Sequence, residues 1–254
     1  MLIQSGARDE MDYRDPEIAE IYDLINPRAQ DTDFYLSLAG QQPCTVLDLG
    51  CGTGTLCCAL AERGHQVTGV DPAAAMLAVA KRKPFAGQVE WVESSAQDYR
   101  SQKRFELIVM TGHALQCLPT DVDALDTFKT MRRHLENRGR IVFESRNPQV
   151  DWAGIWGKRK PVVHKCSSGE LIETLENIVK DDEFVSFQTS YRFKGRVLTT
   201  NSRLRFPCRE HIQELLLGSQ LAVRNLFGDW AGGGFDPANS SEMIFVAETA
   251  SADI

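Results

Sequence analysis

An apolar segment that runs directly into three closely spaced glycines constrains the fold of this chain most strongly. Val46–Leu49 has the pattern of a buried strand, and glycine then occupies positions 50, 52 and 54 before a helical pattern begins. Glycine suits such a turn because it adopts backbone angles closed to other residues and lets a ligand approach the main chain without a Cβ in the way. The segment therefore predicts a ligand site at the carboxyl end of this strand.

Strand and helix patterns alternate along the first part of the chain. The expected strands are 45–49, 66–70, 89–93, 105–110 and 140–144, and the expected helices are 15–26, 56–63, 73–82 and 121–136. This order is typical of parallel strands joined by right-handed crossovers. We predict an α/β fold with a doubly wound, mostly parallel sheet.

The hydrophobic period changes after residue 148. Residues 184–193 alternate between apolar and polar positions, and 198–206 repeat this pattern after a Lys194-Gly195 turn, which predicts an antiparallel hairpin. A partner strand is expected over 170–179, so a small antiparallel β insertion follows the fifth strand. We divide the chain into a main domain, residues 1–148 and 207–254, and an inserted lid, residues 149–206. A helix over 209–217 and strands over 221–227 and 243–247 are expected to complete the main domain.

Asp71 ends the second expected strand, about twenty residues beyond the glycine turn. A carboxylate in this place can accept hydrogen bonds from both hydroxyls of a ribose. The alternative is that Asp71 only caps the helix beginning at Pro72 or Ala73. The joint occurrence of the acid, the glycine turn and this spacing favours nucleoside binding. An NAD or FAD site is disfavoured because Thr55 stands where the dinucleotide fingerprint needs a small residue.

Two segments resemble the first two motifs of class I methyltransferases that use S-adenosylmethionine (SAM). They are Asp48–Gly54, which reads DLGCGTG, and Val67–Lys81, which reads VTGVDPAAAMLAVAK. The chain is most similar to bacterial small-molecule methyltransferases, and specific motifs cover roughly residues 22–148. The resemblance implies a seven-stranded Rossmann-like sheet whose last strand is antiparallel.

The resemblance also implies which residues surround SAM. The glycine turn would lie against the methionine part, Asp71 would hold the ribose and Met76 would pack near the adenine. Ser95 stands where many relatives carry an acid for the adenine amino group, so adenine contacts are expected from Ala96 and Gln97, although turn chemistry explains the serine equally well. The expected cofactor-binding residues are Tyr22, Asp48, Gly50, Cys51, Gly52, Thr53, Gly54, Asp71, Pro72, Met76, Ser95, Ala96, Gln97, Thr111 and Gly112.

His113 follows the fourth expected strand, where relatives carry residues that face the methyl group and the acceptor. A neutral imidazole there can take a proton from an acceptor hydroxyl or amine, which makes His113 the candidate catalytic residue. A histidine that only packs or holds the cofactor is the alternative. The acceptor side is expected partly from the resemblance and partly from exposed positions on the inserted hairpin, with ordinary packing as the alternative. Its residues are Arg146, Trp152, Trp156, Tyr191, Arg203 and Trp230.

Composition limits the partners of the chain. Hydrophobic residues make up 43% and charged residues 25%, as in folded globular proteins. The net charge of -7 opposes binding to a phosphate backbone unless positive charge gathers on one face. The dense basic run at 158–160 is interpreted as a solvated loop, with an anionic substrate or RNA contact as the alternative. Seven cysteines without zinc-type spacing predict reduced thiols and no metal site.

The sequence also bears on location and activity. No apolar stretch approaches the roughly 20 residues that cross a bilayer, and Met1–Glu10 lacks the apolar core of a signal peptide. We expect a cytoplasmic enzyme that binds neither membrane nor nucleic acid. It would transfer a methyl group from SAM to an oxygen or nitrogen of a small molecule and leave S-adenosyl-L-homocysteine (SAH). An RNA or tRNA methyltransferase and a SAM-binding regulator without catalysis are the alternatives. The sequence does not specify the acceptor or the oligomeric state.

Overall fold

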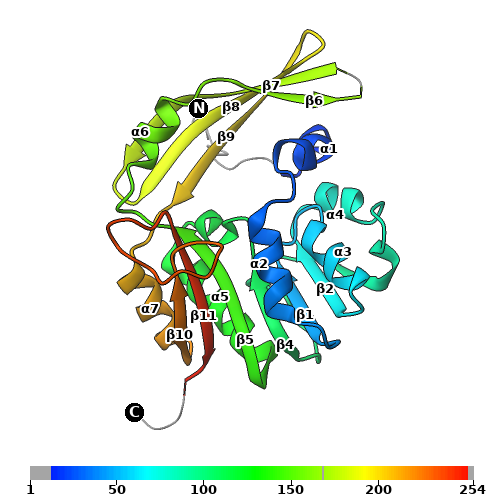
Figure 1. Ribbon diagram of the computed structural model, residues 1–254, viewed down its shortest axis with the longest axis vertical. Helices are drawn as coiled ribbons and strands as arrows, with labels where there is room; N and C mark the ends of the chain where they lie inside the picture. Colours follow the sequence, from blue (N-terminus) through cyan, green and yellow to red (C-terminus); the bar gives the residue numbers. More distant parts are fainter. Residues whose placement is uncertain (1–12, 168, 251–254) are drawn as a thin grey trace, which may run out of the picture.

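Two sheets organise the molecule (Figure 1). The computed structural model describes residues 13–167 and 169–250; Met1–Glu10, on which the signal-peptide expectation rests, lie outside the described residues. The helices are α1 Pro16–Ile25, α2 Gln30–Ala39, α3 Thr55–Glu62, α4 Ala74–Ala80, α5 Asp121–His134, α6 Trp152–Gly157 and α7 Arg209–Gly218, with short 3-10 helices η1 Ala86–Gln88 and η2 Ala114–Cys117.

The larger sheet has seven strands in the order β10-β11-β5-β4-β1-β2-β3. Its strands are β1 Thr45–Leu49, β2 Gln66–Asp71, β3 Val89–Glu93, β4 Phe105–Met110, β5 Leu135–Arg146, β10 Leu221–Phe227 and β11 Glu242–Thr249. Strands β1 to β5 pair in parallel, and β11 is antiparallel to both β5 and β10. The predicted α/β fold with a seven-stranded, mostly parallel sheet and an antiparallel last strand is confirmed.

Helices cover both faces of this sheet because its strands are apolar on both faces. Val46 packs into a cluster with α2 and α3, whereas the next residue, Leu47, packs into a second cluster with α5 and α7. Successive side chains of a strand point to opposite faces, so a continuous apolar run requires a layer of helices on each side. The two cores that result hold the carboxyl ends of β1, β2, β4 and β5 at one edge of the sheet.

The smaller sheet forms the upper part of the molecule in Figure 1 and has the order β6-β7-β8-β9. Its strands are β6 Val162–Cys166, β7 Gly169–Asp181, β8 Phe184–Phe193 and β9 Arg196–Arg205, and all neighbours are antiparallel. We keep the name lid for the insertion at residues 149–206, most of which this sheet forms. It follows β5 in the chain, as predicted for the insertion, while the division into two domains remains a prediction.

Two α-helices and one strand, as well as the two 3-10 helices, were not predicted from the sequence. Helix α2 buries Thr32, Phe34, Tyr35 and Leu36 almost consecutively, so the apolar spacing that marks a helix is weak. Helix α6 and strand β6 are each too short for periodicity to identify. The predicted start of β5 at residue 140 was wrong, because the strand begins at Leu135 directly after α5.

Among residues 13–167 and 169–250, the helices are all too short or too polar to cross a bilayer.

Candidate functional site

The glycine turn and Asp71 are joined by hydrogen bonds at the carboxyl edge of the large sheet. The backbone N–H of Gly52 donates to Asp71 Oδ2 at 2.8 Å, and the N–H of Ala73 donates to Asp71 Oδ1 at 2.8 Å. The N–H groups of Gly50 and Cys51 both donate to the carbonyl of Val70. Asp71 is therefore more than a cap for α4, because it also connects the turn after β1 to the turn after β2.

Asp71 keeps room for a ligand despite these two bonds. A carboxylate offers about four lone-pair positions, so each oxygen can accept one further hydrogen bond. Burial raises the pKa of the Asp71 carboxyl, while the bonds from Ala73 and Gly52 oppose that rise. A neutral pair of ribose hydroxyls suits this acceptor well, since it adds two donors without adding charge.

Gly52 leaves its surroundings open. Its φ of +54° lies in the left-handed region, and a Cβ added there would meet only the ring of Tyr22, at 4.0 Å. The Tyr22 ring on α1 therefore faces the glycine turn at about the distance of one added methyl group. Burial raises the pKa of the Tyr22 phenol, so the side chain is neutral.

Asp48, at the end of β1, is a buried acid with an unfilled acceptor. Its Oδ2 accepts from the Cys57 thiol at 3.3 Å, but its Oδ1 has no hydrogen-bond partner among the described residues. Burial raises the pKa of Asp48 to about 7, partly offset by the Cys57 bond. Of the three glycines, Gly50 and Gly54 pack closely against Ala114 and Trp91, and only Gly52 has no close neighbour. Gly52, the spare acceptors of Asp71 and the unfilled oxygen of Asp48 fit a positively charged adenosyl ligand.

Helix α1 is clamped onto this region by a polar cluster. Asp23 accepts from the hydroxyls of Thr53 and Thr55 at 2.5 and 3.3 Å, and Lys83 Nζ lies 2.6 Å from Asp23 Oδ2. Lys83 also donates to both threonines. The Thr53 side chain thus contacts α1, and only its backbone remains available to a ligand.

The expected adenine side is formed by turn residues and by buried packing. Ser95 Oγ donates to Asp98 Oδ2 at 2.8 Å, and the carbonyl of Gln97 accepts from Arg100 and Thr130. Met76 is buried against α1, whereas Pro72 is exposed and Ala96 is buried.

His113 lies beyond β4 in a constrained turn. Its φ is +59°, which is uncommon for a residue other than glycine, and it follows Thr111 and Gly112. Its backbone N–H donates to Glu144 Oε1 at 2.7 Å, and its Nε2 lies 2.9 Å from Glu242 Oε2. The ring is thereby held by the first residue of β11.

Glu144 supports His113 from the core. It is 1% exposed and also accepts a hydrogen bond from the phenol of Tyr35 on α2. Burial raises the pKa of the Glu144 carboxyl, and the nearby His113 and the Tyr35 bond oppose that rise. The buried Glu144, both of whose oxygens accept hydrogen bonds, therefore stabilises the left-handed backbone conformation of His113.

Arg146 ends β5 next to two tryptophans. Its guanidinium carbon lies 5.6 Å from the Trp152 ring centroid and 5.4 Å from that of Trp156, and it donates to Gln116 Oε1 at 2.9 Å. Arg146 is the cross-strand partner of Glu242, so both lie on one face of the sheet. Three of the expected acceptor residues therefore meet beside the His113–Glu242 pair.

The other three expected acceptor residues lie apart from this group and from one another. Tyr191 is 3% exposed, contrary to the exposure expected from the sequence, because α1 packs against it. Arg203 is exposed, stacks on Phe184 at 4.0 Å and lies on the opposite face of the lid from Tyr191. Trp230 packs against Phe34 and Tyr35 of α2 rather than joining the tryptophans of α6.

Comparison with known proteins agrees with this geometry. Residues 46–139 match the model of a family described as a methyltransferase domain. The cypemycin N-terminal methyltransferase of a Streptomyces species is 29% identical over 240 residues, which cover 92% of this chain and 96% of that protein.

These comparisons support a class I SAM-dependent methyltransferase.

Other comparisons place the fold in the same group. YqeM of Bacillus subtilis is 33% identical over 101 residues, which cover 39% of this chain but only 41% of that protein. The CcbJ methyltransferase of Streptomyces caelestis has a TM-score of 0.77 at 21% identity and covers 96% of this chain and all of its own. CalS10 of Micromonospora echinaspora, an amino pentose methyltransferase with bound SAM, has a TM-score of 0.72 at 18% identity, with 92% of this chain and 97% of that chain covered.

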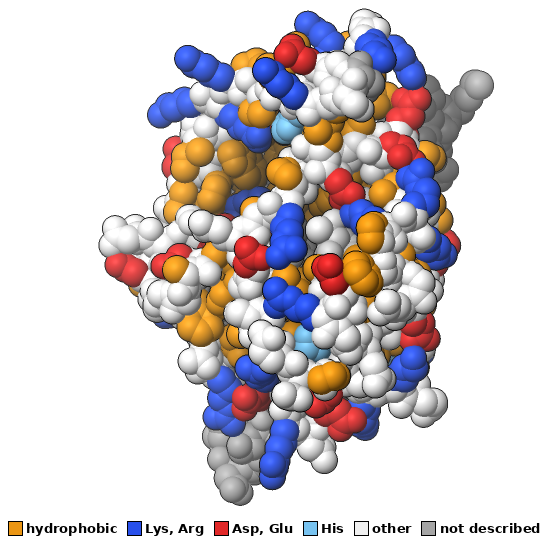
Figure 2. Space-filling model, turned by 45° about the vertical axis from the view of Figure 1, so that its right-hand side comes forward, with side chains coloured by type: hydrophobic (Ala, Val, Ile, Leu, Met, Phe, Trp, Pro, Cys, Tyr) orange, Lys and Arg blue, Asp and Glu red, His pale blue; other side chains and the backbone are white. Residues whose placement is uncertain are grey.

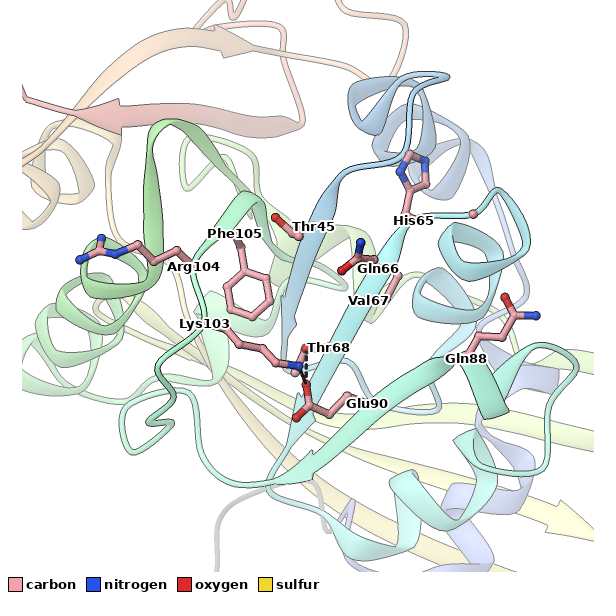
Figure 3. Close-up of a pocket in the computed structure, with 11 residues that line it drawn as sticks. Thr45, His65, Gln66, Val67, Thr68, Gln88, Glu90, Lys103, Arg104 and Phe105 are labelled. Carbon is pink, nitrogen blue, oxygen red and sulfur yellow. Dashed lines mark hydrogen bonds and ion pairs between the residues drawn. The ribbon is translucent and has the colours of Figure 1, made fainter.

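An open cavity of about 580 Å³ lies at the opposite edge of the methyltransferase sheet (Figure 3). It is lined by the first residues of β1, β2 and β4, whereas Asp71 and His113 follow the carboxyl ends of β2 and β4. Within it Lys103 Nζ lies 2.6 Å from Glu90 Oε2, which also accepts from Thr68. These charged groups satisfy one another, so we place the site of this methyltransferase at the glycine turn instead.

Several site residues escaped the sequence analysis. Glu242 begins β11, which lies between β5 and β10, and carries no motif, and Glu144 and Tyr35 come together only through the sheet. Asp23 and Lys83 are distant in sequence and are joined only when α1 packs beside α4. A hydrophobic pattern cannot indicate such pairs, because it specifies which face is buried and not which polar groups meet.

Proposed function

We propose that this methyltransferase transfers a methyl group from SAM to an amine nitrogen of a small molecule held between the large sheet and the lid. One observation supports the proposal most strongly. The glycine turn joined to Asp71 and the His113–Glu242 pair lie beyond neighbouring strands of one sheet edge. A cofactor cradle and a candidate base are thus adjacent.

Different residues of the chain would hold different parts of SAM. The glycine turn would receive the methionine part beside Tyr22, and Asp71 would accept from the ribose hydroxyls. Asp48 would lie near the positive charge with its unfilled oxygen. SAM would supply a methyl group on a positively charged sulfur, with SAH as the product.

His113 would remove the proton that blocks an ammonium acceptor. Because Nε2 pairs with Glu242, the nitrogen left to take up a proton is Nδ1, which has no hydrogen bond to any residue in the described ranges. The Glu242 carboxylate would stabilise the imidazolium that forms. Nearby acids also attract a cationic amine, and the relatives named for an N-terminal and an amino pentose acceptor support the choice of nitrogen.

Positioning would supply most of the rate. Holding acceptor and donor in line is worth roughly 7–11 kcal/mol of the barrier, whereas a general base contributes about 10²- to 10⁴-fold. The negative net charge supports a small-molecule acceptor over a nucleic acid.

Two measurements test the proposal. Calorimetry with SAM and SAH should show binding of both by the pure protein. Incubation with methyl-labelled SAM and a metabolite extract should label an amine, identified by mass spectrometry. Absence of SAM binding would refute the cofactor assignment, whereas binding without any labelled compound would indicate a non-catalytic SAM-binding protein. Tight, salt-sensitive binding of tRNA would contradict the small-molecule assignment.

A further inference from the structure

The inner face of the lid carries a row of hydroxyl groups. Thr189 of β8 is the cross-strand partner of Thr200 of β9, and Ser202 lies two residues further along the same face. Their exposed fractions are 2%, 5% and 3%. Tyr191 points to the same face, whereas Thr199 and Ser190 point to the outer face and are less buried.

Two of these hydroxyls are poorly satisfied inside the protein. Ser202 Oγ makes no hydrogen bond to any residue within 13–167 or 169–250, and Thr200 Oγ1 has the Tyr191 phenol beside it but no hydrogen bond of good geometry. On the outer face, by contrast, Ser190 Oγ donates to Glu176. An unsatisfied buried hydroxyl weakens a fold, so a role beyond folding is needed to account for two of them on one face.

This face looks toward the site described above. At one end of it Tyr191 packs with Ile18 of α1, and at the other Phe187 contacts the Trp156 ring with centroids 5.1 Å apart. The same Trp156 lies beside Arg146 at the end of β5. In Figure 2 hydrophobic side chains line a hollow below the upper end of the molecule, which the lid forms.

We infer that Thr200 and Ser202, with Thr189, bind hydroxyl groups of the acceptor, so that the substrate class is a polyhydroxylated amine of the amino sugar type. The inference rests on the proposed methyl transfer to an amine. A hydroxyl both donates and accepts, which matches ligand hydroxyls of either orientation. The aromatic surface of Trp156 beside the row suits the apolar face of a sugar ring.

The charges around the row oppose a phosphorylated acceptor. On the lid, Arg159 and His164 both contact Glu173, at 3.3 and 2.8 Å. Arg159 is thus already paired with an acid, and Arg146, at the Trp156 end of the row, is stacked on that ring and donates to Gln116. A purely apolar acceptor is disfavoured as well, because it would leave the two hydroxyls unsatisfied.

The variants Thr200→Val and Ser202→Ala test the row directly. Each should lower kcat/KM for a hydroxylated acceptor about two- to tenfold through loss of one hydrogen bond, mainly through KM, with unchanged SAM affinity. Each should also leave the melting temperature unchanged or higher, because an unsatisfied hydroxyl is removed. Thr199→Val, on the outer face of the same strand, is the matched control and should change neither quantity.

The acceptors used are the methyl glycoside of an aminohexose, cyclohexylamine as a ring amine without hydroxyls, and the compound labelled in the extract. The aminohexose should be methylated with kcat/KM at least tenfold above cyclohexylamine, and only its methylation should respond to Thr200→Val. Three outcomes would overturn the inference while methyl transfer stands. They are equal use of both amines, a labelled extract compound without hydroxyls, and an unchanged kcat/KM for the aminohexose in a variant that combines Thr200→Val with Ser202→Ala. Failure of the protein to bind SAM would instead refute the proposed function.

Discussion

At the scale of single residues, we predict that Asp71 has the largest share in ligand binding, because its two oxygens organise both turns at the sheet edge. Asp71→Ala should weaken SAM binding at least a hundredfold, since hydrogen bonds to a charged group are worth about 1.5–3 kcal/mol each. Calorimetry measures the change. Asp126→Ala, at the surface of α5 where Asp126 contacts Lys129, is the control and should bind SAM normally. Unchanged affinity of the Asp71 variant would contradict the ribose assignment.

We predict that His113 acts in the chemical step and not in cofactor binding. His113→Ala should lower kcat by about 10²-fold, at the low end of the range for general bases, with the Kd for SAM unchanged. The control is His211→Ala, because His211 also contacts an acid, Asp121, at 2.7 Å but lies near the molecular surface. Single-turnover rates would separate the two roles. Equal losses in both variants would argue against His113 as the base.

Asp48 should make stability depend on pH. Its pKa is about 7 in the folded chain and near 3.8 when exposed, so the folded state binds more protons between these values. Stability therefore falls as pH rises from about 4 to 7, by up to about 4 kcal/mol from this group. Asp48→Asn should remove this dependence, so its unfolding free energy should exceed the wild-type value more at pH 8 than at pH 5. A difference that is the same at both pH values would exclude an ionisable Asp48 as the cause.

At the scale of elements, the start of α3 depends on its contact with β3. A Cβ at Gly54 would lie 2.4 Å from Cη2 of Trp91, and the residue also has a φ of +70°. Gly64, just beyond the end of the same helix, has a φ of +85° but nothing within 4 Å of an added Cβ. The two glycines therefore separate backbone strain from side-chain overlap.

Gly54→Ala should destabilise the protein by about 2–4 kcal/mol, the sum of left-handed strain and overpacking. Gly64→Ala should cost only about 1 kcal/mol, because strain acts alone there. Denaturant unfolding measures both values. Similar losses at the two positions would mean that Trp91 moves aside without cost.

At the scale of the whole molecule, the ligand should link α1, the glycine turn and the large sheet into one unit. A ligand that binds only the folded state stabilises it by about 2.7 kcal/mol at 100 times its Kd. For a chain of this size SAM should then raise Tm by about 5–10 °C, and SAH at the same multiple of its own Kd should do likewise. Thermal denaturation tests this, with adenine alone at the same concentration as the control. No shift at saturating SAM would contradict a site that spans these elements.

Much of the fold and of the cofactor side follows from local sequence. Each of these features is marked by residues that are adjacent in the sequence, and each was predicted at or within a residue of its observed place. They are the apolar runs of β1 and β4, the glycine turn and Asp71. They are predictable because the backbone angles of a turn and the burial of a strand depend on neighbouring residues. The resemblance to class I methyltransferases rests on the same short segments.

The acceptor side was decided by tertiary structure alone. Strand pairing brings Glu242 opposite Arg146 and beside His113, although about a hundred residues or more separate Glu242 from each along the chain. The register of the lid turns Tyr191 inward and Arg203 outward, and a shift of one residue would exchange them. The alternation of apolar and polar residues in the sequence shows that the two faces of the lid differ. Which of these faces is turned toward the glycine turn depends on how the lid packs against α1. The sequence therefore determined the glycine turn, whereas the packing of the two sheets determined which lid residues face it.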